Sequence, residues 1–269
     1  MKALAIACVR NEEVHVRNLV GGLIRDGLDV ILIDHNSTDR TVTIASEFLG
    51  NGLLEIRPLP WKGVFSLREQ LQEKWACAER GDHDWIVHVD ADEWLTSPRD
   101  GQRLIEAIRE VDNAGYNCID FNEFVFVPLP GEDLSSEDYR RTSDRYYFYR
   151  NAYPFLQRAW KKLAGLDNRP GAGHLLTGDV RMFPEEFIMR HYIVLSEEHA
   201  LAKFTGRLFD PYEVIDGWHL DRLTAKPENL GFPAAGDPRL HVQSNGTRHQ
   251  FDTSRPRKQH YWKWDAEAC

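Results

Sequence analysis

The sequence has no hydrophobic run long enough to cross a lipid bilayer. The apolar run 3–9 is stopped by the polar residues 10–13, and no later run is long enough either. A membrane-spanning helix needs about 20 apolar residues, and a signal peptide needs an apolar core followed by a cleavage site. We therefore expect a cytoplasmic protein, with contact to the inner face of the membrane left open.

Cysteine and positive charge are also scarce. The four cysteines show no metal-site spacing, which favours reduced thiols: Cys8, Cys77, Cys118 and Cys269. Lys and Arg number 33 against 42 Asp and Glu, a net charge of -9. Nucleic-acid binders usually carry a basic excess on at least one domain, so no nucleic-acid partner is expected. The 269 residues are enough to bury a sizeable core.

The first 95 residues alternate between strand and helix patterns. Short, continuous apolar runs typical of buried parallel strands alternate with segments of helical spacing. Strands are expected at 3–9, 29–34, 53–57 and 85–89, and helices at 12–26, 38–50 and 67–80. Gly27 stands where a helix C-cap glycine belongs. This order predicts a parallel sheet, which binds ligands beyond the carboxyl ends of its strands.

The second half of the chain is less regular. Strands are expected at 117–127 and 146–149, a strand or hairpin at 181–192, and a helix at 197–207. Pro, Gly and Asn are frequent from residue 226 on, which indicates an extension with little core of its own. We therefore predict one α/β domain at 1–225, with a nucleotide-binding half at 1–95 and an acceptor half at 96–225, followed by a C-terminal extension at 226–269.

Two aspartates follow the fourth predicted strand directly. Asp90 and Asp92 stand at i and i+2 after the run 85–89, so both carboxylates can reach one site. Such oxygen ligands suit Mg²⁺ or Mn²⁺, which keep several waters and bind phosphate oxygens. A solvated turn would show the same letters. The position at a strand end, facing the polar clusters 10–12 and 34–39, favours the metal site.

Three motifs in this order resemble the family-2 glycosyltransferases of the GT-A fold, bacterial type with a D-x-D motif. They are Ala7–Glu12, Leu32–Asp39 and Val87–Leu95, and a weaker match continues through Arg190–Tyr192 and Ser196–Lys203. The resemblance implies a mostly parallel central sheet flanked by helices, with an irregular C-terminal extension. It also implies a hexosyltransferase-type enzyme that uses Mn²⁺ or Mg²⁺.

The resemblance assigns roles to individual residues. It places the base and ribose of a nucleotide beside Asp34, Asn11 and Glu12. It makes Asp39 a brace for its loop, and it brings Arg68 near the donor. Asp90 would touch the ribose or the metal, Asp92 the metal, and His191 the metal or the diphosphate. The family often has Asp or Asn where this chain has His35, which leaves the identity of the base open, with uridine as the family default.

The catalytic base has no clear motif. An inverting transfer needs a carboxylate or histidine that takes the proton of the acceptor hydroxyl. Glu186 is the favoured candidate and Asp179 the next, with the Glu132-Asp133 pair as a further option. His174 and His219 are additional candidates for the site. A solvated surface carboxylate or a hydrogen-bonded structural histidine is the alternative for each.

The middle of the chain is basic. Arg140, Arg141, Arg145, Arg150 and Arg158 precede Trp160-Lys161-Lys162. Such a stretch can touch the phosphates of a donor or lipid carrier, or an anionic membrane surface, although a solvated basic face is the commoner explanation.

Together these features favour a metal-dependent inverting glycosyltransferase. It would move a sugar from a nucleotide-diphosphate sugar, with UDP as the default nucleotide, to a hydroxyl of a glycan, glycolipid or other acceptor. Surface polysaccharide or glycolipid synthesis is the setting that the resemblance implies. The alternatives are a sugar-phosphate nucleotidyltransferase and a non-catalytic nucleotide-sugar or glycan binder. The first usually needs a glycine-rich loop after its first strand, where this chain has Arg10-Asn11-Glu12-Glu13.

Overall fold

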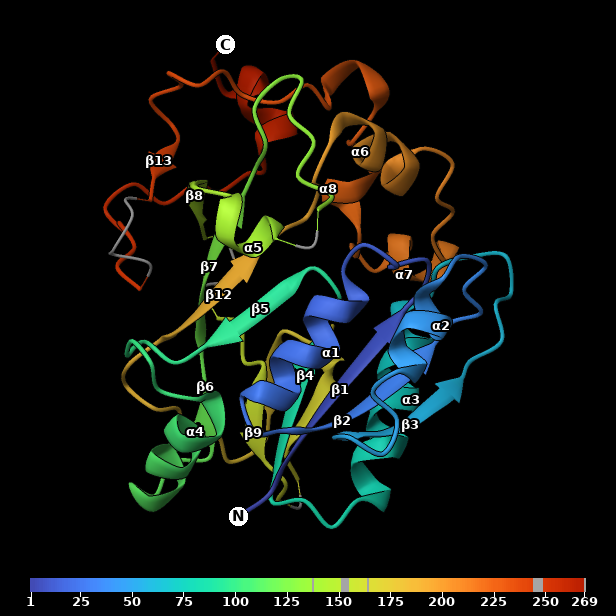
Figure 1. Cartoon of the computed structure of the whole chain (residues 1–269), viewed down its shortest axis with the longest axis vertical. Helices are drawn as coiled ribbons and strands as arrows, with labels where there is room; N and C mark the ends of the chain where they lie inside the picture. The colour runs from blue at the N-terminus through green and yellow to red at the C-terminus, as the bar shows by residue number, and fades with distance from the viewer. Residues whose placement is uncertain (137, 151–154, 164, 244–248, 269) are drawn as a thin grey trace. The chain divides into compact units, whose positions relative to one another are not determined.

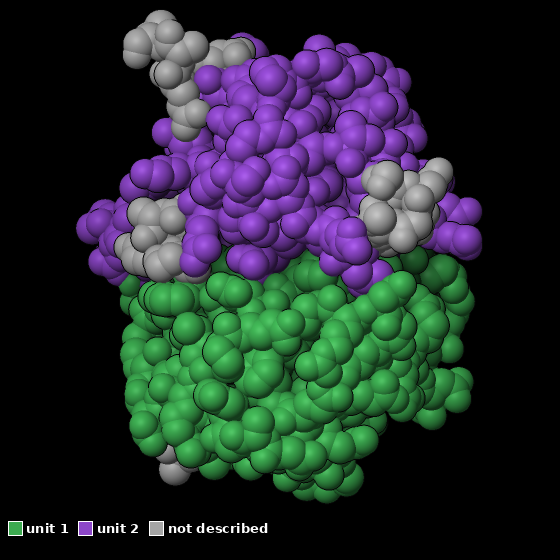
Figure 2. Space-filling view, turned by 90° about the vertical axis from the view of Figure 1, so that its left-hand side faces the viewer, with its two compact units in different colours: residues 1–62, 67–121, 155–189 green, residues 63–66, 122–154, 190–269 purple. Residues whose placement is uncertain are grey.

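The computed structural model describes the whole chain except residues 137, 151–154, 164, 244–248 and 269. Contacts divide the chain into two compact units, coloured separately in Figure 2. Unit 1 comprises residues 1–62, 67–121 and 155–189, and unit 2 comprises 63–66, 122–154 and 190–269. These boundaries differ from the predicted ones because each unit is assembled from separate segments of the chain.

Unit 1 is built on a six-stranded sheet with the order β3-β2-β1-β4-β9-β6 (Figure 1). Its parallel strands are β1 (Ala3–Val9), β2 (Asp29–Asp34), β3 (Leu53–Pro58) and β4 (Trp85–Val89). Two short strands complete one side of the sheet: β9 (Ala159–Lys161) is antiparallel to β4, and the edge strand β6 (Cys118–Ile119) is antiparallel to β9. The predicted strands are confirmed, with the third extended by one residue.

Helices cover both faces of this sheet. They are α1 (Val16–Arg25), α2 (Thr41–Ser46), α3 (Leu67–Arg80) and α4 (Leu104–Asn113). The alternation of β1 shows the two faces: Ala3, Ala5 and Ala7 join the core with α1 and α4, whereas Leu4 and Ile6 join the core with α3. The predicted helix 67–80 is confirmed, whereas α1 and α2 are shorter than expected because loops at 10–15 and 35–40 take their first residues.

Gly27 ends α1 as the sequence predicted. Its φ is +84°, its N–H donates to Ile24 O (2.9 Å), and Leu28 N–H donates to Leu23 O (3.1 Å). These two bonds form a Schellman motif, which needs a left-handed residue at this position. A Cβ on Gly27 would lie 2.5 Å from Ile105 Cγ2 of α4.

Gly27→Ala is therefore expected to lower the free energy of unfolding by about 2 kcal/mol, from left-handed strain and overpacking together. Gly50 is a matched control, because its φ is +78° but no atom lies within 4 Å of its added Cβ. Gly50→Ala should cost only the strain, about 1 kcal/mol. Urea unfolding of both variants measures the difference, and equal losses would contradict the contact with Ile105.

The remaining elements of unit 1 are short. They are β5 (Glu93–Thr96), β10 (Asp167–Gly171) and β11 (Leu175–Thr177), and the last two form a hairpin. No strand was predicted at the positions of β5, β9, β10 and β11, and no helix at the position of α4.

Unit 2 contains neighbouring strands in the order β13-β8-β7-β12. Their bounds are His241–Val242, Arg145–Tyr149, Phe121–Phe126 and Phe187–His191, so the ends of β7 and β12 extend into unit 1. The helices are α5 (Tyr139–Thr142), α6 (Glu197–Phe204), α7 (Pro211–Ile215) and α8 (Leu220–Leu223), with 3-10 turns at Pro227–Asn229 and Tyr261–Ala268. Across the described residues, no helix is both long and apolar enough to cross a membrane.

The C-terminal segment contributes to the core of unit 2. Phe232, Tyr261, Trp262 and Trp264 are buried there with Tyr147 of β8. Residues 226–269 were expected to have little core of their own, and the structure instead makes them part of the core of unit 2. The sequence did not indicate this because a few widely spaced aromatic residues bury much area without producing a periodic pattern.

Candidate functional site

The carboxyl ends of β1, β2 and β4 lie at one edge of unit 1. Val9 is opposite Asp34 of β2, and Ala7 is opposite Val89 of β4. Adjacent strands lie about 4.8 Å apart, so the residues that follow these three strands form one continuous rim. The predicted clusters after the first, second and fourth strands therefore meet in space.

Asn11 joins the loops after β1 and β2. Its backbone is left-handed, with a φ of 55°. Its N–H donates to Ser37 Oγ (3.0 Å), and its Oδ1 accepts from Thr38 N–H (2.8 Å). The Asp34 carboxylate accepts from Ser37 N–H (3.1 Å). These bonds hold Asn11 and Asp34 in a fixed rim.

Asp39 connects the same two loops at a second place. Its Oδ2 accepts from Glu13 N–H (3.1 Å) and its Oδ1 from Thr41 N–H (2.9 Å). Glu12 N–H donates to Thr41 Oγ1 (2.8 Å). Asp39 thus contacts the backbone of both loops, which is the geometry of a brace.

Trp61, His35 and Arg10 form a cluster of ring contacts beside this rim. The Arg10 guanidinium lies 4.2 Å from the ring centre of Trp61, and the His35 ring meets Trp61 edge-on at 4.9 Å. Arg10 also donates to the carbonyl of His35 (2.8 Å). Burial lowers the pKa of His35, and Gln70 Nε2 lies 3.1 Å from His35 Nδ1. A neutral ring that accepts this bond at Nδ1 carries its proton at Nε2.

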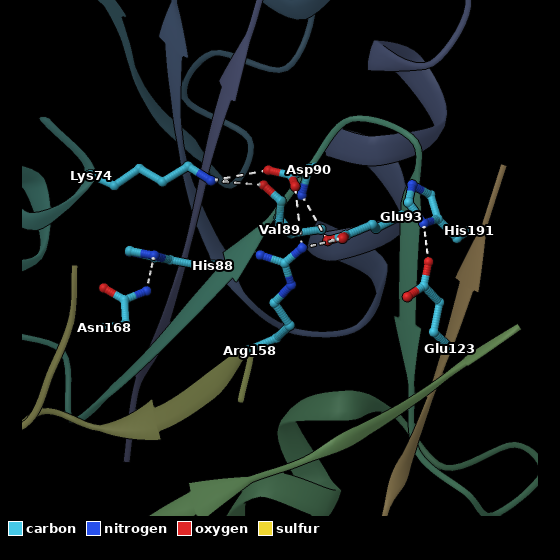
Figure 3. A network of polar contacts seen from close by, with 9 residues as sticks. All are labelled: Lys74, His88, Val89, Asp90, Glu93, Glu123, Arg158, Asn168 and His191. Carbon is cyan, nitrogen blue, oxygen red and sulfur yellow. Dashed lines mark hydrogen bonds and ion pairs between the residues drawn. The ribbon is translucent and has the colours of Figure 1, made fainter. Parts of the chain in front are cut away.

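Asp90 is held by two buried cations (Figure 3). Lys74 Nζ lies 3.3 Å from its Oδ1 and Arg158 Nη2 lies 3.2 Å from its Oδ2. Lys74 and Arg158 are only 2% and 5% exposed, whereas the Asp90 side chain is 47% exposed. Burial opposes ionisation of this carboxyl, but Lys74 and Arg158 outweigh it and hold the pKa of Asp90 well below its ordinary value. Asp90 therefore presents a permanent carboxylate at the rim.

Glu93 shapes the turn after β4. Its Oε2 accepts from Asp90 N–H (2.9 Å), and its N–H donates to Asp90 O (3.2 Å). Its other carboxylate oxygen contacts Arg158, and the residue is 1% exposed. Asp92 lies within this turn and is 8% exposed. Glu93 and Arg158 thus fix the backbone that carries Asp90 and Asp92.

Lys74, Glu93 and Arg158 were not among the individual site residues predicted. Lys74 has the pattern of one polar residue of an amphipathic helix and carried no signal. Glu93 lies inside the Val87–Leu95 motif, and Arg158 belongs to the basic stretch for which both phosphate contact and a solvated face were considered.

His88 lies two residues before Asp90, on the face of β4 that packs against Trp160. Asn168 Nδ2 lies 2.8 Å from His88 Nδ1, and the ring meets Trp160 edge-on at 4.6 Å. Burial, with the charges of Lys74 and Arg158, lowers the pKa of His88 well below its ordinary value. A neutral, packed ring here supports the strand and adds no charge to the rim.

Asp179 lies at the other end of the parallel strands, near the first residue of β4. Its carbonyl accepts from Asn117 Nδ2 (2.8 Å), and Asn117 O accepts from Lys161 N–H (2.9 Å). Lys161 pairs with Trp85, the first residue of β4. Asp179 is therefore separated from Asp90 by the length of β4.

Glu186 lies outside the edge strand β6. The next residue, Phe187, donates its N–H to Asp120 O (2.8 Å), immediately after β6. Two strands, β9 and β6, stand between this position and β4, a separation of roughly 10 Å or more. The structure brings neither Glu186 nor Asp179 together with Asp90.

The other candidates occupy several places. Arg68 is exposed in the first turn of α3. His174 closes the β10–β11 hairpin, where Ala172 has a φ of 52° and His174 N–H donates to Gly171 O (2.9 Å). It lies close enough to Asp90 for its protonated form to lower the pKa of that carboxyl.

Two of the candidate histidines lie in unit 2. His191 is at the end of β12 and its Nδ1 is 2.6 Å from Glu123 Oε1 (Figure 3). His219 is left-handed, with a φ of 63°, and its Nε2 is 2.7 Å from Glu213 Oε2. Each ring is thus oriented by a buried carboxylate.

The residues of the rim fit a divalent cation that arrives with a phosphate ligand. Among the described residues, no three His, Cys, Asp or Glu side chains are placed to hold a metal ion together. Asp90 and Asp92 are nevertheless two oxygen ligands at one turn, and Mg²⁺ sites often use one or two carboxylates completed by substrate phosphates and water. These two oxygen ligands suit a site shared with the phosphate and water, and not a site in which the protein supplies every ligand.

Comparison with solved structures finds distant likenesses. Residues 1–349 of TarS from S. aureus share 12% identity at a TM-score of 0.45, over 85% of this chain and 71% of that one. The same protein solved with UDP-GlcNAc shares 16% identity at a TM-score of 0.36. That match covers 51% of this chain, and the chain spans only 39% of the TarS fragment. No curated protein matches this chain.

The family model described as glycosyl transferase family 2 matches residues 5–161, which is more than half of the chain. The match includes β1 to β4, all three strand-end loops of the rim, and Arg158. It confirms the predicted family, and the mostly parallel sheet flanked by helices confirms the predicted GT-A fold class. The chain belongs to glycosyl transferase family 2.

Proposed function

We propose that this protein transfers a sugar from a nucleotide-diphosphate sugar, with UDP as the default nucleotide, to an acceptor hydroxyl. The observation that carries the proposal is the single rim formed by the ends of β1, β2 and β4, which places Asp34 and the Asp90–Asp92 pair on either side of the end of β1. In open α/β sheets this edge is where ligands bind. Family membership supplies the class of reaction.

The rim has separate places for the parts of such a donor. Asp34, Asn11 and Glu12 lie together at the ends of β1 and β2 and would bind the base and ribose. Asp39 would keep that pocket in shape through its bonds to both loops. Arg68 would approach the donor from the start of α3.

The paired aspartates would hold the diphosphate end through a cation. Asp92 would be the main ligand of Mn²⁺ or Mg²⁺, with Asp90 beside it. When bound, such a cation neutralises the diphosphate and makes it a better leaving group. The protein's own contribution is to keep Asp90 charged through Lys74 and Arg158, and to fix the turn that carries Asp90 and Asp92 through Glu93.

The reaction would proceed with inversion. The acceptor oxygen forms a bond to the anomeric carbon while the bond from that carbon to the diphosphate oxygen breaks, and the acceptor proton passes to a base. A base must lie within hydrogen-bond reach of that hydroxyl. Because Glu186 and Asp179 lie away from the rim, we assign neither to this step.

Thermal unfolding with a panel of nucleoside diphosphates, each with and without Mn²⁺, tests the proposal. A ligand that binds only the folded state adds about 2.7 kcal/mol of stability at a hundredfold excess over its Kd. We expect one diphosphate to raise the Tm in the presence of Mn²⁺, which would also identify the base. No stabilisation by any diphosphate would contradict the donor site.

Two further assays separate the alternatives. Release of pyrophosphate from a nucleoside triphosphate and a sugar phosphate would indicate a nucleotidyltransferase. Tight donor binding without sugar release at any cation concentration would indicate a non-catalytic binder. The acceptor is proposed to be a glycan or glycolipid hydroxyl, at a cytoplasmic site that includes contact with the inner membrane face.

A further inference from the structure

Lys74 is a buried cation in direct contact with the proposed cation site. It lies in the middle of α3, and its Nζ is 3.3 Å from Asp90 Oδ1 and 3.4 Å from Val89 O. Removing an ammonium from water is costly unless a charged partner compensates it. Asp90 provides that compensation, so the position of Lys74 depends on Asp90 and the charge of Asp90 is offset by Lys74.

Arg158 contacts the same carboxylate from a different element. It lies just before β9, and its Nη2 is 3.2 Å from Asp90 Oδ2 and also contacts Glu93. Each oxygen of Asp90 therefore faces its own cation (Figure 3). Two positive side chains balance the two carboxylates of Asp90 and Glu93 in this network, so Asp90 attracts a third cation only weakly.

We propose that Lys74 is a positioning residue that acts as an internal counter-ion for Asp90 and makes cation binding depend on the nucleotide diphosphate. In the ligand-free protein Lys74 competes with a divalent cation for Asp90. When a diphosphate binds, its negative charge offsets the repulsion between Lys74 and the cation. This inference rests on the proposed donor site and adds a rule for how the binding of one ligand changes the affinity for the other.

The rule is a coupling between two ligands. If the diphosphate raises the affinity for the cation by some factor, the cation must raise the affinity for the diphosphate by the same factor. Removal of the Lys74 charge should weaken this coupling, because the cation then binds Asp90 without help. The variant should thus bind Mn²⁺ more tightly than the wild type when no nucleotide is present.

Lys74→Met, which shortens the unbranched side chain by one atom and removes its charge, tests the rule. Mn²⁺ binding is measured by calorimetry, with and without the diphosphate identified by thermal protection. We expect the variant to bind Mn²⁺ about tenfold more tightly without nucleotide, because one unit of nearby positive charge is lost. The enhancement of Mn²⁺ affinity by the diphosphate should fall by a similar factor.

Lys161→Met is the matched control. Lys161 forms an ion pair with Asp112 (2.6 Å), but it pairs with Trp85 at the opposite end of β4. The same loss of charge there should leave Mn²⁺ affinity unchanged. Lys74→Arg, which keeps the charge, should resemble the wild type, and Lys74→Gln provides a second neutral variant if Lys74→Met does not fold.

The outcomes distinguish this inference from the proposed function. If the wild type binds a diphosphate with Mn²⁺, but a folded neutral variant of Lys74 shows unchanged Mn²⁺ affinity without nucleotide, the counter-ion role is wrong and the donor site stands. A wild type that binds no diphosphate under any condition overturns both.

Discussion

Asp92→Asn is expected to lower the rate of sugar transfer by about a hundredfold while the protein stays folded. The amide has the size of the carboxylate but lacks its charge, so it is a much poorer ligand for Mn²⁺ or Mg²⁺. A cation that stabilises the leaving diphosphate supplies several kcal/mol, and roughly 2.7 kcal/mol corresponds to a factor of 100 in rate. The diphosphate should also lose its Mn²⁺-dependent effect on the Tm.

Initial rates of donor consumption at saturating Mn²⁺ measure the effect. Asp179→Asn is the matched control, because it makes the same chemical change on an exposed residue at the other end of the parallel strands. Its rate should equal that of the wild type. An equal loss in both variants would mean that Asp92 has no special place in the site, and a loss confined to Asp179→Asn would identify Asp179 as part of the machinery.

Arg158→Met is expected to lower the free energy of unfolding by about 3 kcal/mol. Arg158 is buried and contacts Glu93, which is 1% exposed, as well as Asp90. Removal of one partner of a buried ion pair leaves the other charge without compensation, which typically costs 3–5 kcal/mol. Urea unfolding monitored by tryptophan fluorescence measures the loss.

Two comparisons show whether the loss comes from the stranded charge. Arg103→Met removes an arginine that pairs with Glu106 on the surface, where both side chains are well exposed, and should cost less than about 1 kcal/mol. Adding Glu93→Gln to Arg158→Met removes the uncompensated carboxylate and should recover part of the stability. If the double variant is less stable than Arg158→Met by the full cost of Glu93→Gln alone, the two residues are not coupled.

The sequence by itself determined the parallel half of the fold. Strands 3–9, 29–34 and 85–89 and helix 67–80 were predicted with their observed bounds, because a strand buried on both faces is a continuous apolar run and a surface helix has apolar residues at helical spacing. The same local rules place Asp34 and Asp90 at strand ends. Family membership followed from those motifs.

Very short strands could not be predicted in this way. Strand β9 has three residues, too few for a period to show, and it forms because its partners in the sheet bind it. The two residues of β6 were predicted only as part of one strand, 117–127, which the structure divides into β6 and β7. The two units likewise combine segments far apart in the chain, and the aromatic residues of 226–269 reach the core of unit 2 without a repeating pattern.

The charge balance of the site was decided by the tertiary structure. Lys74 and Arg158 stand 16 and 68 residues from Asp90 along the chain, on a helix and beside a short strand. Nothing local distinguishes either from a solvated basic residue. Only the packing of α3 on the sheet and the pairing of β9 with β4 remove both from water and direct them at one carboxylate, because a buried cation is stable only where the fold supplies an opposite charge.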